Sequence, residues 1–206
     1  MNLQFSVSWF DDVARPVWDQ LIPQINPSRL LEVGSYEGAS ACYLIQALGV
    51  SKSIELYCVD TWEGGVEHQQ AGIPMSDIEV RFDQNVREVC ARVPLPVEVV
   101  KCKGCSDRVL AQLLVEGKQG YFDFIYIDGS HQAPDVLCDA VLGFRLLKIG
   151  GVIVFDDYLW REHAVPESDP LRCPKPAIDA FTNLYFRKLD IFRAPLYQLY
   201  ARKLTD

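Results

Sequence analysis

Residues 29–48 read RLLEVGSYEGASACYLIQAL, and this stretch decides the fold. The apolar run at 29–33 is typical of a buried strand, and the apolar spacing over 39–48 is typical of a helix. Between them lies a glycine turn with the pattern ExGxxxG, running from Glu32 through Gly34 to Gly38. A strand, a tight turn and a helix in this order predict a repeating unit with parallel strand pairing.

The same alternation continues through the chain and predicts an α/β fold. Further strands are expected at 54–59, 97–102, 122–127 and 152–155, with helices at 77–90, 106–115 and 133–147. The run FDFIYI at 122–127 lacks polar alternation, which fits a sheet covered on both faces. Outside this series we expect a helix at 11–21, a proline-containing loop, a helix at 177–186, and a hairpin of 188–193 and 197–203.

Length and composition restrict the function. The 206 residues predict a single domain, with a helical N-terminal extension at 1–28 and a lid-like loop at 158–176. Lys and Arg number 20 against 28 Asp and Glu, and this acidic balance is unsuited to a nucleic-acid partner. Neither a long apolar run nor a secretory signal is present, so no membrane partner is expected. Seven cysteines, an odd number, fit reduced thiols in a cytoplasmic protein.

The glycine turn argues against a bound pyrophosphate. A dinucleotide fingerprint has a second glycine two residues after the first, where this chain has Tyr36. Glu32 suits a cationic or hydrogen-bond-donating ligand better than a phosphate. Asp60 ends the second predicted strand, where an acid commonly accepts hydrogen bonds from ribose hydroxyls. A plain strand-to-helix turn and a turn-forming aspartate are the structural alternatives.

Acidic residues follow two of the predicted strands. Asp128 comes directly after the fourth, and Asp156 and Asp157 follow the fifth. Parallel strands end at one edge of a sheet, so these carboxylates should converge, which is costly without a cation between them. Such an all-oxygen set suits Mg²⁺, Mn²⁺ or Ca²⁺. His131 could then act as a general base, although a turn and a helix cap would also explain this pattern.

These residues resemble the class I S-adenosylmethionine-dependent methyltransferases. The resemblance is carried by LEVGSYEGAS, CVDTWEGG, CKGCSDRVLAQLL, FDFIYIDGSH and LLKIGGVIVFDD, which together span roughly residues 29–158. The pair DGSH and GGVIVFDD is similar to small-molecule O-methyltransferases, including macrolide-sugar and cephalosporin-pathway enzymes. The resemblance implies a Rossmann-like, doubly wound sheet of seven strands in the order 3-2-1-4-5-7-6, with strand 7 antiparallel.

The resemblance also implies an O-methyltransferase site. The glycine loop would receive the methionine end of S-adenosylmethionine, and Asp60 its ribose. The full set of expected cofactor-binding residues is Glu32, Gly34, Ser35, Tyr36, Gly38, Asp60, Thr61, Trp62, Ser106 and Asp128. The expected metal ligands, with Mg²⁺ favoured, are Asp128, Asp156 and Asp157. His131 and Asp128 would act in catalysis on a small-molecule acceptor.

Three other interpretations are compatible with parts of the sequence. A nicotinamide oxidoreductase shares the acid at Asp60 but leaves Tyr36 and the acidic residues unexplained. A non-catalytic cofactor-binding member of the family stays open, as does the oligomeric state, a homo-oligomer included. The CxxC string of Cys102 and Cys105 suggests a redox or zinc role, but the strand–helix series is much longer than a thioredoxin unit. His68 and His163 are expected at the surface.

Overall fold

The computed structural model describes residues 3–66, 68, 72–161 and 169–206. Within this part of the chain, the strands form a seven-stranded sheet in the order β3-β2-β1-β4-β5-β7-β6. The antiparallel strand is β7, which runs opposite to both β5 and β6. The predicted fold class and strand order are therefore confirmed. The chain divides into two compact units, Met1–Gly104 and Cys105–Asp206.

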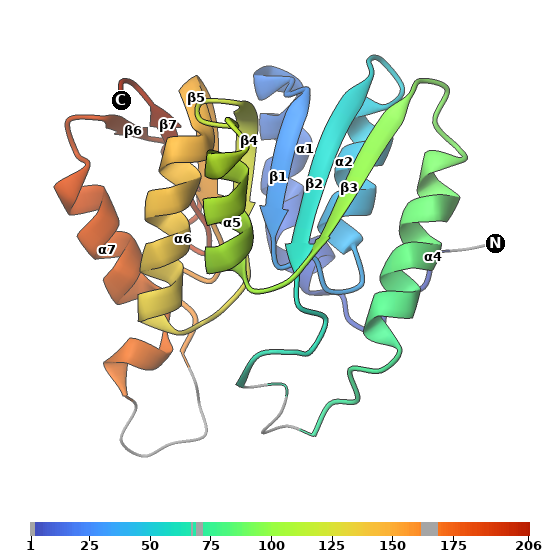
Figure 1. Cartoon of the computed structure of the whole chain (residues 1–206), viewed down its shortest axis with the longest axis horizontal. Helices are drawn as coiled ribbons and strands as arrows, with labels where there is room; N and C mark the ends of the chain where they lie inside the picture. The colour runs from blue at the N-terminus through green and yellow to red at the C-terminus, as the bar shows by residue number, and fades with distance from the viewer. Residues whose placement is uncertain (1–2, 67, 69–71, 162–168) are drawn as a thin grey trace. The chain divides into compact units, whose positions relative to one another are not determined.

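The first unit contains three parallel strands and the helices that precede and connect them (Figure 1). A π-helical turn, Phe10–Ala14, leads into α1 (Arg15–Ile25), which is followed by β1 (Arg29–Val33), α2 (Ala39–Leu48), β2 (Ile54–Asp60), α4 (Ile78–Cys90) and β3 (Val97–Lys103). Helix α2 packs against both α1 and α4. Helix α1 begins and ends four residues later than predicted, and Pro16 lies in its first turn, where proline needs no amide hydrogen.

The second unit contains four strands, with α5, α6 and α7 packed in sequence order along one face (Figure 1). Its elements are α5 (Ser106–Val115), β4 (Phe122–Ile127), α6 (Ala133–Leu146), β5 (Leu147–Phe155), a 3₁₀ turn (Pro170–Arg172), α7 (Lys175–Leu184), β6 (Leu189–Ile191) and β7 (Leu199–Lys203). Part of the expected lid-like loop, residues 162–168 with His163, lies outside the described residues.

Apolar side chains of the strands and helices form the core of each unit. In the first unit, Leu30 and Leu56 are fully buried together with Ile45. In the second, Phe124 and Phe155 are fully buried, as is Phe181 of α7. None of the seven cysteines forms a disulfide, in agreement with the predicted reduced thiols. No helix among the described residues is long and apolar enough to span a membrane.

Strand register determines which side chains meet at the ends of β4 and β5. These strands pair in parallel with Ile127 opposite Phe155, so the next residue of each chain segment is an aspartate. Strand β7 pairs antiparallel to β5, with Tyr200 opposite Val154. Because side chains alternate between faces, residues two positions apart share a face. Side chains from β4, β5 and β7 that share a face therefore lie side by side near the ends of these strands.

Candidate active site

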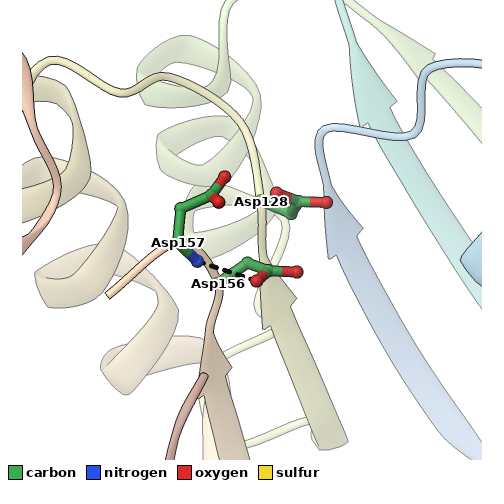
Figure 2. Close-up of side chains that lie close together, drawn as sticks. All are labelled: Asp128, Asp156 and Asp157. Carbon is green, nitrogen blue, oxygen red and sulfur yellow. Dashed lines mark hydrogen bonds between the residues drawn. The ribbon is translucent and has the colours of Figure 1, made fainter. Parts of the chain in front are cut away.

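Three carboxylates meet at the ends of β4 and β5 in the second unit. Asp128 follows β4, and Asp156 and Asp157 follow β5, as Figure 2 shows. One carboxylate oxygen from each lies within 4.8 Å of those of the other two. A small pocket beside them is lined by Gly129, Ser130, His131 and Pro174, among others. The structure therefore brings the three predicted metal ligands together, and carboxylate oxygens are the donors that a hard divalent cation prefers.

Asp156 has the most constrained side chain of the three. Its Oδ1 accepts a hydrogen bond from the backbone N–H of Asp157 at 2.7 Å (Figure 2). Its Oδ2 accepts from Gln198 Nε2 at 2.7 Å and also contacts the hydroxyl of Tyr126. Burial and the nearby charge of Asp157 raise the pKa of Asp156 to about 6. The negative charge at this position is therefore costly in the absence of a cation.

Tyr126 lies between two of the acids. Its hydroxyl is 2.9 Å from Asp128 Oδ2 and also contacts Asp156, but it has one proton to donate. Burial, together with the charges of Asp128 and Asp156, raises the pKa of this phenol well above its ordinary value. Tyr126 thus stays neutral and cannot compensate both carboxylates at once.

His131 joins the cluster through Asp157. Its Nε2 lies 2.8 Å from Asp157 Oδ2, and its ring contacts that of Trp160 at a tilt of 35°, with centroids 4.0 Å apart. Asp157 itself adopts a left-handed backbone conformation, with φ of +56°. Non-glycine residues rarely adopt this conformation, and such strain is concentrated at functional sites. The predicted base is therefore oriented by one of the predicted metal ligands.

The predicted cofactor loop in the first unit is built around buried acids. Glu32 is fully buried and accepts hydrogen bonds from the hydroxyls of Ser35 and Ser40. Burial raises its pKa to about 7, although the two hydroxyl donors oppose that shift. Gly34 and Gly38 both have positive φ, which glycine adopts without a steric penalty. A side chain at Gly38 would also meet the ring of Phe82, 3.0 Å from a Cβ placed there.

Asp60 holds this loop in place. Its Oδ2 accepts hydrogen bonds from the backbone N–H groups of Ser35 and Tyr36, both at 2.8 Å, and its Oδ1 accepts one from Trp62 N–H at 2.7 Å. Trp62 is buried, and its indole N–H donates to the carbonyl of Tyr36 at 2.9 Å. Thr61 instead caps the next turn through the N–H of Glu63. The glycine loop and the end of β2 therefore form one hydrogen-bonded structure.

One histidine of the first unit differs from the sequence expectation. His68 was expected at the surface, but it is half-buried against the rings of Tyr36 and Trp9. Ser106 begins α5 in the second unit, close to the buried carboxylate of Asp139. Burial raises the pKa of Asp139 to about 7. Sequence reasoning missed Asp139 because it lies within a predicted amphipathic helix.

Sequence reasoning also missed the side chains that surround the acids. Tyr126 could have been found, since it lies two residues before Asp128 on the same strand and therefore shares its face. Gln198 and Tyr200 could not, because their position depends on the antiparallel register between β7 and β5. Trp160 follows the acids in a loop, where no periodicity predicts a contact.

Comparison with known proteins gives a consistent result. A family model described as a methyltransferase domain matches residues 31–158. A caffeoyl-CoA O-methyltransferase of Populus kitakamiensis is 26% identical over 169 residues, which cover 80% of this chain and 63% of the relative. A second relative, caffeoyl-CoA O-methyltransferase 1 of Eucalyptus globulus, is 27% identical over 75% of this chain and 54% of its own length. The chain thus spans less than two thirds of these relatives.

Solved structures share the fold at low sequence identity. The O-methyltransferase from Bacillus cereus, in complex with SAH, is 18% identical with a TM-score of 0.62, covering 100% of this chain and 84% of that one. The O-methyltransferase TomG from Streptomyces achromogenes, in complex with SAM, is 16% identical with a TM-score of 0.61, covering 98% of this chain and 82% of that one. At these identities the likeness concerns the fold.

Proposed function

The chain belongs to the methyltransferase domain family, and from this premise we propose that it transfers a methyl group from S-adenosylmethionine to a small-molecule hydroxyl with the help of a divalent cation. The observation that carries the proposal is the convergence of Asp128, Asp156 and Asp157 within 4.8 Å. Family membership supports the methyl transfer. The names of the relatives, which are O-methyltransferases, support oxygen as the acceptor atom.

The three aspartates fit a hard cation. Their donor atoms are all carboxylate oxygens, which Mg²⁺ and Mn²⁺ prefer over softer metals. The donors that hold Asp156 are uncharged, so its charge stays available for an ion. When bound there, the cation would supply positive charge that lowers the pKa of an acceptor hydroxyl. That contribution matters because a hydroxyl is a weak nucleophile at neutral pH.

His131 is the proposed proton acceptor. An imidazole has an ordinary pKa near working pH, so it can take a proton and release it again. Its contact with Asp157 at 2.8 Å would stabilise the imidazolium that forms. Trp160, whose ring packs against the imidazole, restricts its orientation. The histidine is therefore held in position before the acceptor arrives.

The glycine loop and Asp60 are the proposed cofactor-binding elements. Gly34 leaves the loop backbone without a side chain at one position, which permits close approach of a ligand, whereas the space beside Gly38 is filled by the ring of Phe82. This loop is built or bordered by Glu32, Ser35, Tyr36, Thr61 and Trp62. For Ser106 and Asp128, which lie in the second unit, cofactor binding stays a prediction from the sequence. The methyl group of a sulfonium is already activated, so the main task of these residues is alignment.

Calorimetry tests the proposal before any acceptor is known. The chain is titrated with S-adenosylmethionine and, separately, with NAD. Each titration is carried out with Mg²⁺ present and again with excess chelator. We expect saturable binding of S-adenosylmethionine and none of NAD. Binding of NAD alone would favour an oxidoreductase. A subsequent screen of hydroxyl acceptors should give methyl transfer that chelator abolishes, and transfer that survives chelator would remove the cation from the proposal.

A further inference from the structure

The side chains behind Asp156 form an ordered chain of hydrogen bonds that the family assignment does not explain. Tyr200 donates its hydroxyl proton to Gln198 Oε1, and Gln198 Nε2 donates to Asp156 Oδ2. Gln198 and Tyr200 are 3% and 1% exposed, so water does not compete for these contacts. We propose that Gln198, oriented by Tyr200, is the positioning residue that fixes Asp156 for divalent-cation binding; this rests on the proposed function.

Strand register explains why these residues meet. Tyr200 is opposite Val154 on β5, and Val154 is opposite Tyr126 on β4, so these three form one row across the sheet. Two residues further towards the same edge of the sheet, which is later in the chain on β4 and β5 but earlier on the antiparallel β7, the same face carries Asp128, Asp156 and Gln198. The second row is thus a direct consequence of the first. Gln198 comes from a segment far along the chain, yet the antiparallel pairing delivers it to the acid.

Chemistry determines which end of the Gln198 amide faces the acid. The amide has one donor end and one acceptor end. The Tyr200 hydroxyl can donate to the oxygen, which leaves the NH₂ group directed at Asp156. If the amide were reversed, its oxygen would face a carboxylate oxygen without a proton between them. The carboxylate of Asp156 therefore selects the orientation of the amide, and the hydrogen bond from Tyr200 to the amide oxygen holds Gln198 in that orientation.

A neutral donor is the appropriate residue for this task. A lysine or arginine at this position would hold Asp156 equally well, but its charge would neutralise the carboxylate and compete with an external cation. The donors that Asp156 has among the described residues are the amide of Gln198, the hydroxyl of Tyr126 and the backbone N–H of Asp157. All three restrict rotation of the carboxylate while leaving its negative charge in place.

The test is a double-mutant cycle read out as Mn²⁺ affinity. Free Mn²⁺ is followed by electron paramagnetic resonance during titration of the wild type, Gln198→Leu, Tyr200→Phe and the double variant. Loss of a residue that orients a metal ligand typically lowers metal affinity about 10- to 100-fold, and we expect Gln198→Leu to fall in this range. Tyr200→Phe should give a smaller loss. The double variant should match Gln198→Leu, because Tyr200 acts through Gln198.

Matched variants separate positioning from folding. Gln112→Leu makes the same change at an exposed residue of α5 and should leave Mn²⁺ affinity unchanged. Circular dichroism and thermal unfolding of each variant establish that it is folded, and Tyr200→Phe, which removes one oxygen atom, keeps the test available if Gln198→Leu does not fold. Independent, additive effects of the two changes on Mn²⁺ affinity would overturn the inference, as would wild-type affinity in folded Gln198→Leu.

The wild-type titration distinguishes this inference from the function on which it rests. If the wild type binds no Mn²⁺, the proposal that a cation assists methyl transfer is wrong, and the positioning role of Gln198 is overturned with it. If the wild type binds Mn²⁺ and both variants bind it equally well, the proposed function stands and the inference alone is wrong.

Discussion

The acids of the two units are surrounded by different kinds of partners. In the first unit, Glu32 and Asp60 receive hydrogen bonds from serine hydroxyls and backbone N–H groups, and each bond holds part of a loop. In the second unit, three carboxylates crowd within 4.8 Å, and neutral groups support Asp156. A buried acid can therefore stabilise a loop when its hydrogen-bond donors come from that loop. Crowded acids with neutral supports indicate a ligand.

The largest effect should follow removal of one crowded acid. Asp156→Asn keeps the shape of the side chain but removes its charge, so cation affinity and methyl transfer should fall by at least about 100-fold. Affinity for S-adenosylmethionine should change little. Calorimetry with Mn²⁺ and with the cofactor measures both quantities on one preparation. Undiminished transfer in Asp156→Asn would mean that the crowded acids serve structure, like those of the first unit.

A second substitution tests the loop-building acids. Asp60→Ala leaves the N–H groups of Ser35, Tyr36 and Trp62 without their acceptor. Unsatisfied amides of this kind are costly, so the free energy of unfolding should fall by about 2–3 kcal/mol, and cofactor affinity should fall with it. Urea denaturation measures the change in stability. A loss of cofactor affinity with unchanged stability would show that Asp60 contacts the cofactor without building the loop.

The glycine loop offers a smaller and better controlled change. Gly38→Ala places a side chain at φ +81° and 3.0 Å from the ring of Phe82, so we expect a loss of about 1–2 kcal/mol from backbone strain, plus a contribution from the contact. Gly117 has the same φ of +81°, with nothing within 4 Å of an added Cβ. Gly117→Ala therefore isolates the strain. Equal losses of stability at both positions would mean that the ring of Phe82 moves aside at no cost in free energy.

Asp139 represents a third kind of buried acid and should give the smallest effect. It is 1% exposed, and neither of its oxygens has a hydrogen-bond donor within range among the described residues, although the nearby side chain of Ser106 favours the charged form. Its pKa is raised from an ordinary 3.8 to about 7, chiefly by burial and further by the charges of Asp135 and Asp107. The folded state therefore holds a proton that the unfolded chain releases at lower pH.

The sign of the pH effect follows directly. The contribution of Asp139 to stability is complete below its ordinary pKa and is lost as pH rises towards about 7, by at most about 1.4 kcal/mol per pH unit. Asp139→Asn should make the free energy of unfolding depend less steeply on pH. Glu32, with a pKa near 7, contributes a slope of the same sign and keeps it in the variant. Urea denaturation between pH 4.5 and 8 compares the two proteins, and parallel curves would contradict the assignment.

Much of the fold was predictable because local pattern and tertiary structure agree. The strands at 29–33 and 122–127 and the helices at 39–48 and 106–115 match their predicted limits. Strand β5 begins at Leu147, earlier than the predicted 152. The prediction missed its first part because Lys148, Ile149 and Gly150 are exposed there and do not continue the buried apolar run. Helix α7 begins at Lys175, since Pro176 is tolerated in a first turn.

The acids of the site were predictable for a simple reason. Asp128 and Asp156 each follow a recognisable strand, and parallel pairing brings strand ends together. Their supports were not, because Gln198 reaches Asp156 through a register that no local sequence pattern determines. Likewise, the sequence predicts Trp62 as a cofactor-binding residue but does not show that its backbone and indole N–H groups both donate within the loop structure. Sequence alone does not reveal which of a loop's polar groups are already occupied.

The anchoring of both chain ends has a practical consequence for protein engineering. Near one end, Ser6 donates its backbone N–H and its hydroxyl to Glu37 in the glycine loop. Near the other, the amino group of Lys203 donates to the carbonyls of Phe144 and Leu147 and holds the last strand on the second unit. A purification tag fused directly to either terminus would pull on one of these anchors. A flexible spacer, or cleavage of the tag before assay, would prevent an effect of the tag from being mistaken for a property of the protein.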